Sequence, residues 1–447
     1  MKSQYLNNPA AVCPHIVSDG TSQGESLVEA VRLIVPSWSS ATADSVEIQP
    51  LTGGITNVLF KLTRQDDVVS PPLIVRLFGH GTSLFVDRHK ENVVFSELSR
   101  LDIGSPTFYG LFENGRVEGF LEARAVTPSE MHDARVYPRI ATAVARLHSL
   151  GPRIRDLDWE PALLPKLRTF FGLALRVAFP ESEPAKQEQL AGLRLEEFRA
   201  QMEQLAAQLQ ADKAEAERVL ALGRAQLALP PPPEEGALGP GALLQNADTA
   251  EAAAAVLAFD KVLCHNDLLS GNILLALSVL PLPEVPGTEG VTLIDLEYAG
   301  CNPRGFDLAN HFCEFAGFGF DLANQFPDSQ KRQAYLHCYL DAAAAAAAAA
   351  AAPSGSSSEP AEPVSAVLAA WASLRLRNDS PAAAAHCTHF ASALDCAVCR
   401  FLPASHLFWA AWSVVQASLS AIDFDFLAYA RKRFDGYLLH RNVAGLA

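Results

Sequence analysis

The chain has 447 residues, 49% of them hydrophobic, and a formal net charge of −15 at pH 7. This length exceeds that of a usual single compact domain and, with that apolar content, predicts two lobes with a sizeable core. The acidic balance argues against binding to nucleic acid or to anionic membrane surfaces through a basic field, and it suits a small cationic substrate better.

The N-terminal part of the chain predicts a β-rich region. A short helical pattern at Leu27 to Ile34 is followed, from Val46 onward, by apolar alternations broken by turns, which predict a twisted antiparallel sheet. Gly53 and Gly54 lie between strands expected at Val46 to Ile48 and Val58 to Leu62. Paired glycines let the backbone approach phosphate groups closely. A plain hairpin turn is the alternative.

The next predicted strand, Leu73 to Phe78, carries Arg76 within an otherwise apolar run. Arg76 could reach the phosphates of a nucleotide, or it could lie on a solvated edge strand. The pattern at Asp87 to Leu98 then predicts an amphipathic helix. Glu91 or Glu97 on that helix could pair with Arg76.

The chain continues with a predicted hairpin and then turns helical. Pro106 to Leu121 contains a Glu-Asn-Gly turn and reads as two strands. Val136 to Leu150 has helical periodicity apart from an early Pro, and it opens a helical region.

Three segments have biased compositions, near 205–258, 276–290 and 342–385. In the first, the residues up to about Ala228 are helix-prone, and a Pro-rich part that resembles a linker follows. The last contains an uninterrupted run of Ala from Ala342. We expect all three to be surface expansions, because such inserts tolerate changes in length at modest entropic cost.

Two apolar, strand-like runs within Val262 to Phe315 each end in acidic or amide residues. Asp267 and Asn272 follow the first run, and Asp295 follows the second. An isolated Asp or Asn in a loop is usually a turn former or a helix cap. Here His265-x-Asp267-x4-Asn272 is followed by Asp295 after a second strand, which is a spaced constellation and points to catalysis.

This constellation resembles the catalytic half of protein-kinase-like phosphotransferases, in which an Asp base, an Asn five residues later and a metal-binding Asp occur in this order. The segment from Asp295 to Glu314 resembles more narrowly the choline/ethanolamine kinase family. Leu296-Glu297 stands where protein kinases have Phe-Gly, which excludes an ordinary protein kinase.

The resemblance implies an α+β, two-lobed, protein-kinase-like fold. We expect an N-terminal extension at 1–45 and a small nucleotide-binding lobe with an antiparallel sheet at 46–127. Glu122 to Thr127 would form the linker beside the adenine. A larger, mostly helical catalytic and substrate-binding lobe, which contains the three inserts, would occupy 128–447.

The resemblance also assigns roles at the phosphate and metal side of the site. Asp267 would be the catalytic base, and Asn272 and Asp295 would bind Mg²⁺, a hard ion that prefers oxygen ligands. His265 and Asp307 would support the catalytic loop. The residues expected to bind ATP are Gly53, Gly54, Thr56, Asn57 and Arg76.

Four further residues are expected to bind the substrate amine: Glu314, Trp409, Trp412 and Tyr429. Aromatic faces attract alkylammonium groups, and a carboxylate supplies charge and hydrogen bonding. Taken alone, a Trp-x-x-Trp helix face is more often core, and Glu314 could form a structural ion pair. Their position downstream of the family's signature favours a binding role.

These residues predict ATP-dependent phosphorylation of ethanolamine to phosphoethanolamine, which is the first step of phosphatidylethanolamine synthesis in the family's pathway. Leu269, where choline kinases typically have Gln, and the segment IDFDFLAYA favour ethanolamine over choline. The alternatives are a choline kinase, a catalytically silent nucleotide-binding scaffold, and an antibiotic or sugar kinase of related fold. The family resemblance also allows a homodimer.

The Cys and His residues do not predict a metal site. The eight Cys show the ordinary usage of reduced thiols. Neither a signal-peptide pattern nor an unbroken apolar run of membrane-spanning length is apparent, and we expect a cytoplasmic protein without a membrane span. One group resembles a zinc site, but its spacing is imperfect and we expect structural thiols: His386, Cys387, His389, Cys396 and Cys399.

Overall fold

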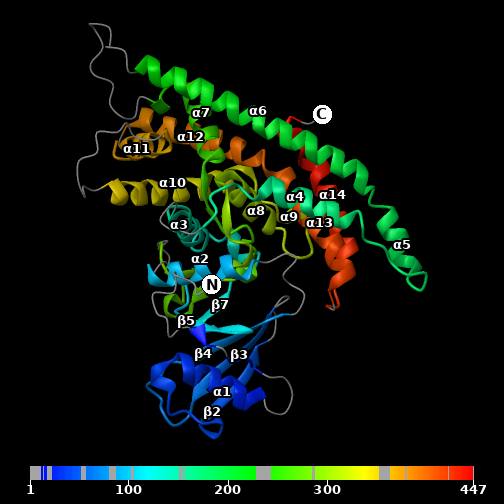
Figure 1. Cartoon of the computed structure of the whole chain (residues 1–447). Helices are drawn as coiled ribbons and strands as arrows, with labels where there is room; N and C mark the ends of the chain where they lie inside the picture. The colour runs from blue at the N-terminus through cyan, green and yellow to red at the C-terminus, as the bar shows by residue number, and fades with distance from the viewer. Residues whose placement is uncertain are drawn as a thin grey trace.

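The computed structural model describes residues 12–13, 15–17, 23–51, 57–79, 87–101, 105–150, 154, 157–227, 243–283, 287–351, 363–377, 380–420 and 422–445. Two lobes are visible in Figure 1: a smaller one built on a β-sheet at one end of the molecule, and a larger one made mostly of helices. The predicted α+β, two-lobed fold is confirmed.

The sheet of the smaller lobe has six strands. All neighbours are antiparallel except β1 and β5, which are parallel. Because β4 lies between β3 and β6, the edge-strand alternative for Arg76 is wrong. The strands are, in spatial order, β1 (Val12–Cys13), β5 (Phe108–Phe112), β6 (Gly115–Gly119), β4 (Leu73–Phe78), β3 (Asn57–Arg64) and β2 (Val46–Leu51).

The N-terminal helix α1 (Gln23–Ile34) belongs to the core of this lobe. Its apolar stripe, which includes Leu27 and Val31, packs with Trp38 against buried sheet residues such as Phe60 and Leu62. An apolar stripe at helical spacing is stable only when another element covers it. The residues expected to form an extension without chemistry therefore complete the hydrophobic core under the sheet.

Helix α2 (Arg88–Arg100) connects the two lobes. It begins at Asp87, whose side chain accepts a hydrogen bond from the backbone N–H of Lys90 at 3.1 Å, a typical N-cap. Its apolar residues, among them Val94 and Phe95, pack into the core of the larger lobe. The helix predicted over Asp87 to Leu98 is confirmed.

Two small sheets of the larger lobe hold the polar loops of the site. The first contains β7 (Ala123–Ala125), β9 (Ile273–Ala276) and β10 (Val291–Leu293), and the second pairs β8 (Lys261–Cys264) with β11 (Gly300–Pro303). Strands β8 and β9 flank Asp267, and β10 ends two residues before Asp295. Both loops are therefore anchored at both ends.

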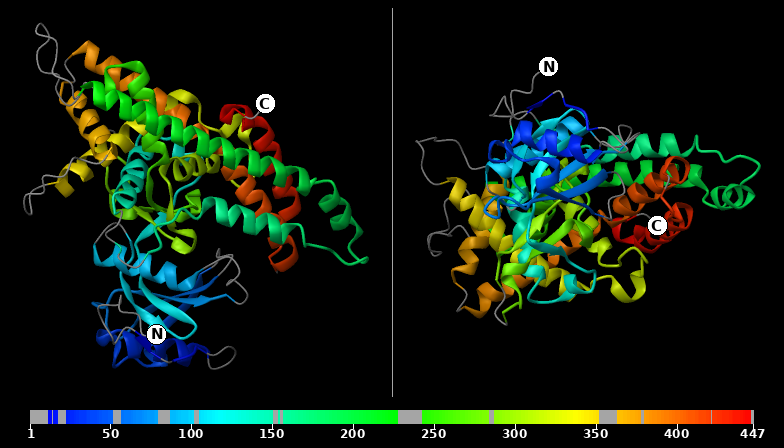
Figure 2. Two further views of the ribbon diagram at one scale, coloured as in Figure 1. Left: turned by 45° about the horizontal axis from the view of Figure 1, so that its top comes forward. Right: turned by 90° about the horizontal axis from the view of Figure 1, so that it is seen from below.

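The rest of the larger lobe is helical. The long helix α6 crosses the side of this lobe that lies farthest from the β-sheet (Figures 1 and 2). None of the described helices is both long and apolar enough to cross a membrane. The helices are α3 (Tyr137–His148), α4 (Leu163–Ala174), α5 (Pro184–Ala191), α6 (Leu195–Leu227), α7 (Ala247–Phe259), α8 (Arg304–Glu314), α9 (Leu322–Gln325), α10 (Ser329–Ala351), α11 (Pro363–Arg375), α12 (Pro381–Cys399), α13 (Leu402–Leu419) and α14 (Phe426–His440).

The expectation that the biased segments are surface expansions is wrong for parts of α7, α10 and α11, whereas the described residues of 276–290 are exposed or half-buried. Ala247–Phe259, expected to resemble a linker, forms helix α7, whose small side chains allow close packing between α6 and α12. Ala343 and Ala344 of the alanine run are buried in α10. Trp371 of α11 is fully buried, and its indole N–H donates to Asp341 at 2.9 Å.

Candidate active site

The loop that carries Asp267 is held by the carboxylate of Asp307 from α8. One oxygen of Asp307 accepts the backbone N–H of His265 at 2.9 Å, and the other accepts that of Asn266 at 2.6 Å. His148 Nε2 also lies 2.9 Å from Asp307. Although burial opposes it, these partners lower the pKa of Asp307, so the carboxylate stays ionised and the loop has a fixed acceptor.

His265 has structural contacts on both ring nitrogens. Its Nε2 lies 2.8 Å from the carbonyl oxygen of Ile294, and its Nδ1 accepts the backbone N–H of Asp267 at 3.3 Å. Burial lowers the pKa of His265, which favours the neutral ring that this pattern of one donor and one acceptor requires. The ring therefore ties the loop of Asp267 to the strand that precedes Asp295.

Asp267 and Asn272 face each other across the loop. Asn272 Nδ2 donates to the Asp267 carboxylate at 3.0 Å and to its backbone carbonyl at 2.9 Å. Burial, followed by the negative charges of Glu314, Asp295 and Glu297, raises the pKa of Asp267 well above the usual carboxyl range. A raised pKa makes this carboxylate a better proton acceptor, as a general base requires.

Asp295 and Arg76 bring the two lobes into contact at the site. Asp295 has a left-handed backbone, with φ of 60°, which is uncommon for a residue with a side chain and is often found at functional sites. Its Oδ1 lies 3.5 Å from Arg76 Nη1. Although burial opposes it, Glu118 and then Asp295 raise the pKa of Arg76, so its guanidinium remains charged inside the sheet.

The prediction that Glu91 or Glu97 pairs with Arg76 is wrong. Arg76 Nε instead donates to Glu118 of the neighbouring strand at 2.7 Å, because the two side chains lie on the same face of the sheet. Glu91 pairs with Arg116 at 2.7 Å and with Arg88. Glu118 is shared by Arg76 and Arg116, which lower its pKa to about 2 against the effect of burial.

The expected phosphate-binding turn is only partly described. Gly53, Gly54 and Thr56 lie outside the described residues, so the structure does not test their predicted role. Asn57 begins β3 and is buried, and its backbone pairs with that of Phe78. Asn57 therefore lies beside the end of β4, opposite a residue that follows Arg76 by two positions.

The carboxylate of Glu314 lies at the end of α8. Its Oε1 accepts a hydrogen bond from Arg433 Nη2 of α14 at 2.7 Å. Glu314 is also the first charged residue among the causes of the raised pKa of Asp267, so the two carboxylates are electrostatically close. The end of α8 thus carries a carboxylate that Arg433 holds in place and whose charge acts on the proposed base.

Both tryptophans expected at the amine site are buried on α13, and their polar edges have partners. Trp409 Nε1 donates to Asn310 Oδ1 at 2.8 Å, and Trp412 Nε1 donates to the Tyr298 hydroxyl at 2.9 Å. The ring centroids of Tyr298 and Trp409 are 5.4 Å apart. Because the indole edges are engaged by the protein, the ring faces are what the tryptophans can offer to a ligand. Tyr429 of α14 lies near the same region, since its ring centroid is 5.5 Å from the central carbon of Arg433, the partner of Glu314. Burial, and then Glu314 and Asp267, raise its pKa.

Two residues at the site, Tyr298 and Lys166, were given no role in the sequence analysis. Tyr298 is fully enclosed, and burial, then Glu297 and Asp267, raise its pKa well above the usual range. Lys166 Nζ lies 5.6 Å from the Tyr298 ring, and burial and Lys90 lower its pKa to about 8. The position of Tyr298, three residues after Asp295, was a usable signal. Lys166 comes from helix α4, distant in the sequence, and no pattern in the sequence pointed to it.

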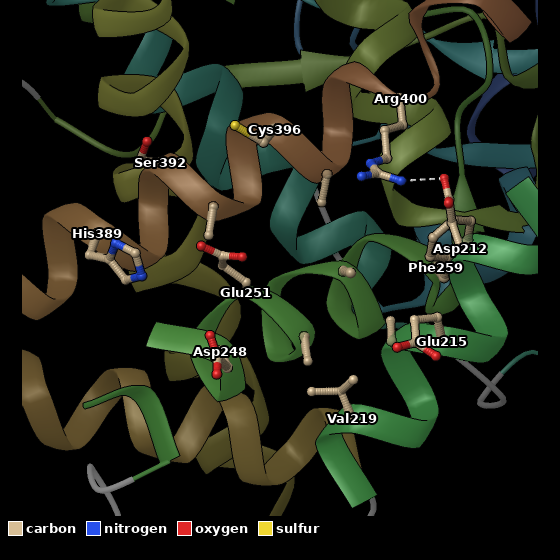
Figure 3. A pocket seen from close by; sticks show the side chains of 15 residues that line it. Asp212, Glu215, Val219, Asp248, Glu251, Phe259, His389, Ser392, Cys396 and Arg400 are labelled. Atoms are coloured by element: carbon tan, nitrogen blue, oxygen red, sulfur yellow. Dashed lines mark ion pairs between the residues drawn. The ribbon is translucent and has the colours of Figure 1, made fainter. Parts of the chain in front are cut away.

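The His and Cys residues of α12 do not form a zinc site. His389 and Cys396 line a cavity of about 650 Å³ between α6, α7 and α12 (Figure 3). Cys387 and Cys399 are buried. Acidic side chains of α6 and α7 face this cavity, and Arg400 pairs with Asp212 there. Among the described residues, the one cluster with metal-ligand spacing is His148, Cys264 and Asp307. Asp307 of that cluster already accepts three N–H groups, from His148, His265 and Asn266.

The donor set between the lobes suits Mg²⁺. Asn272 uses its Nδ2 for Asp267, which leaves its carbonyl oxygen as a possible ligand, and Asp295 offers a carboxylate. Oxygen donors of this kind are preferred by hard divalent cations. The residues present therefore fit the metal that phosphoryl transfer from ATP requires.

An Asp within a braced loop, an Asn five residues later, a second Asp after the next strand and a buried Arg on the facing sheet are the parts of a protein-kinase-like phosphotransferase. The choline/ethanolamine kinase family profile matches residues 48–438. The chain therefore belongs to the choline/ethanolamine kinase family and is a small-molecule kinase whose acceptor is an alcohol group; membership of a kinase family implies the use of ATP.

The chain is similar both to proteins named as ethanolamine kinases and to proteins named as choline kinases. A probable ethanolamine kinase A from Dictyostelium discoideum is 27% identical, covering 94% of this chain and 93% of its own. A probable choline kinase 2 from Arabidopsis thaliana is 26% identical, covering 92% and 90%. The solved structure of an ethanolamine kinase from Plasmodium vivax is 20% identical, covers 96% and 93%, and superposes with a TM-score of 0.63, which supports the fold.

Proposed function

We propose that this protein is an ethanolamine kinase that transfers the γ-phosphoryl group of ATP to the hydroxyl of ethanolamine. The observation that carries the proposal is the Glu314 carboxylate, which Arg433 orients through a hydrogen bond of 2.7 Å and whose negative charge helps to raise the pKa of the base candidate Asp267. A primary ammonium has three N–H donors and needs such an acceptor. The same small molecule would place its hydroxyl at one carboxylate and its ammonium at the other.

In the proposed reaction, the Asp267 carboxylate accepts the proton of the substrate hydroxyl as the hydroxyl oxygen forms a bond to the γ-phosphorus. The bond from that phosphorus to the bridging oxygen of ADP breaks in the same transfer. The raised pKa of Asp267 supports this role, because the carboxylate holds a proton more strongly than an exposed one.

Two groups of residues would bind the nucleotide and its metal. Asn272 and Asp295 would hold Mg²⁺, which, when bound, neutralises charge on the triphosphate. Arg76 would contact the phosphates with the part of its guanidinium that does not bond to Glu118. Glu118 orients that guanidinium and keeps it in place inside the sheet.

Choline kinase is the second candidate, and the ring cluster favours it. Trp409 and Trp412 have ring centroids 5.4 Å apart, and Tyr298 lies against Trp409. Aromatic faces bind a quaternary ammonium without hydrogen bonds. The preference for ethanolamine rests on Glu314 together with Leu269 and the segment around Asp423.

The test is a panel of acceptors incubated with ATP and Mg²⁺, with products identified by phosphorus NMR. Ethanolamine, choline, an aminoglycoside and a hexose cover the candidate classes. We expect phosphoethanolamine as the main product and no phosphorylated sugar or antibiotic. ATP-dependent product from the hexose or the aminoglycoside alone would refute the proposal, and absence of any product would support the silent scaffold.

A further inference from the structure

Arg433 is a fully buried cation at the edge of the proposed amine site. Its side chain is 0% exposed, and Glu314, at 11% exposure, is the one carboxylate with which it pairs in the described part of the chain. Arg433 Nε and Nη1 have no hydrogen-bond partner among the described residues. A guanidinium buried in this way is stable only if it stays paired with its carboxylate.

Aromatic rings complete the surroundings of this guanidinium. Its central carbon lies 4.5 Å from the ring centroid of Phe320 and 5.5 Å from that of Tyr429. Phe320 has a left-handed backbone, with φ of 54°, which is unusual for a bulky residue, and its ring also contacts His406. The protein's own cation thus occupies ring faces that would otherwise be available to a substrate cation.

The ion pair has two consequences for an incoming amine. It fixes the Glu314 side chain through Oε1, which leaves Oε2 as an acceptor with a defined direction. It also partly cancels the negative charge of Glu314. A quaternary ammonium, which gains only from charge and ring contact, therefore gains less here than a primary ammonium, which can donate a hydrogen bond to the fixed oxygen.

We propose that Arg433 is a positioning residue that orients Glu314 for a primary ammonium and thereby makes the site discriminate against a quaternary one. The inference rests on the proposed function, because it takes Glu314 as the residue that receives the substrate ammonium. Arg433 itself touches no reacting atom and acts through Glu314.

The test is a double-mutant cycle of wild type, Arg433→Gln, Glu314→Gln and the double variant, with kcat and KM measured for ethanolamine, choline and ATP. We expect Arg433→Gln to raise KM for ethanolamine roughly tenfold or more, since hydrogen bonds to charged groups are stronger than neutral ones. KM for choline should change much less, and kcat and KM for ATP should stay within about twofold. In the Glu314→Gln background, the Arg433 substitution should add little.

Lys432→Gln is the matched control, because Lys432 is the neighbouring cation on α14 and its Nζ donates to the carbonyl of Gly319 instead of a carboxylate. It should leave the ratio of the two amines unchanged. If Arg433→Gln does not fold, as shown by its thermal unfolding, Arg433→Lys takes its place in the same cycle. Lys keeps the charge but not the planar fork, so a smaller shift in the same direction is expected.

The inference is overturned if Arg433 variants change both amines equally, or if their full effect persists without the Glu314 carboxylate. The wild-type preference reports separately on the proposed function. A wild type that favours choline refutes ethanolamine kinase activity, while the cycle still decides whether Arg433 acts through Glu314. If the wild type phosphorylates neither amine, both the proposed function and the proposed role of Arg433 are refuted.

Discussion

Replacing Asp267 by Asn tests the proposed base with little change in shape. Asn272 Nδ2 donates to the side chain and to the backbone of Asp267, at 3.0 and 2.9 Å. The introduced amide keeps an oxygen that can accept the first of these bonds, so the loop should hold its conformation. The negative charge and the proton acceptor are lost.

A positioned general base contributes about 10²- to 10⁴-fold to the rate. With a tenfold change for each 1.36 kcal/mol, Asp267→Asn should raise the activation free energy by about 3 to 5 kcal/mol. We expect kcat to fall by this factor, and KM for ATP to change little because no contact of Asp267 with the nucleotide is invoked.

The same substitution should stabilise the protein at neutral and alkaline pH. A carboxyl whose pKa is raised by folding binds its proton more tightly in the folded state, so its favourable contribution is present at low pH. That contribution is lost as the pH rises from the unfolded value of about 3.9 through the folded pKa. Above both values the ionised Asp267 destabilises the fold, and its removal should raise Tm by about 1 to 3 °C at pH 8.

The assay combines steady-state kinetics with thermal unfolding from pH 5 to pH 8. The gain in Tm should be largest at pH 8 and should shrink as the pH falls and the wild-type carboxyl takes up its proton. Asp44→Asn, at an exposed carboxylate of the smaller lobe, is the control for a change of charge alone. A kcat within about threefold of wild type would refute the general base; a lower Tm at pH 8 would refute the account of the raised pKa.

Three further substitutions test other parts of the site and fold. Glu314→Gln removes the charge that, after burial, most raises the pKa of Asp267. The acidic limb of the pH profile of kcat should therefore move to lower pH. An unchanged limb would show that the charge of Glu314 does not affect the pKa of Asp267. Asp307→Asn weakens the acceptor for two loop N–H groups and for His148, and should lower the free energy of unfolding in urea by about 1 to 3 kcal/mol together with kcat. An unchanged urea midpoint would contradict this bracing role. Trp371→Ala leaves a cavity under α11 and should lower the free energy of unfolding by about 3 to 5 kcal/mol, whereas a smaller loss, under about 1 kcal/mol, would mean that α11 is dispensable.

Local patterns in the sequence predicted the elements that hold the loops. The strand over Leu73 to Phe78 and the helix over Asp87 to Leu98 are present almost to the residue. The spacing was enough to predict that Asp267 and Asn272 lie close together, because they are five positions apart in one loop. The periodic spacing of apolar residues also predicted the helix within Val136 to Leu150, which the structure shows at Tyr137–His148.

Contacts between distant residues could not be predicted in this way. Arg76 and Glu118 are 42 residues apart, and they meet because two strands pair in a register that the sequence does not state. Arg433 and Glu314 are 119 residues apart and come from different helices. The segment from Asp295 to Glu314 marked Glu314, but no local pattern marked Arg433 as its partner.

Burial of the alanine-rich segments was also beyond the sequence. A run of Ala indicates a helix, because Ala has the highest helix propensity, but it lacks the contrast of polar and apolar residues that shows which face is covered. Helix α7 is buried because α6 and α12 pack on it. Composition suggested an exposed linker there, and tertiary packing overrode that indication.

The most direct test of the central claim, that the site selects a primary ammonium, is a competition between ethanolamine and choline for the wild-type enzyme with ATP and Mg²⁺. The ratio of phosphorylated products at equal amine concentrations gives the ratio of kcat/KM. The account predicts an excess of phosphoethanolamine. An excess of phosphocholine would contradict it.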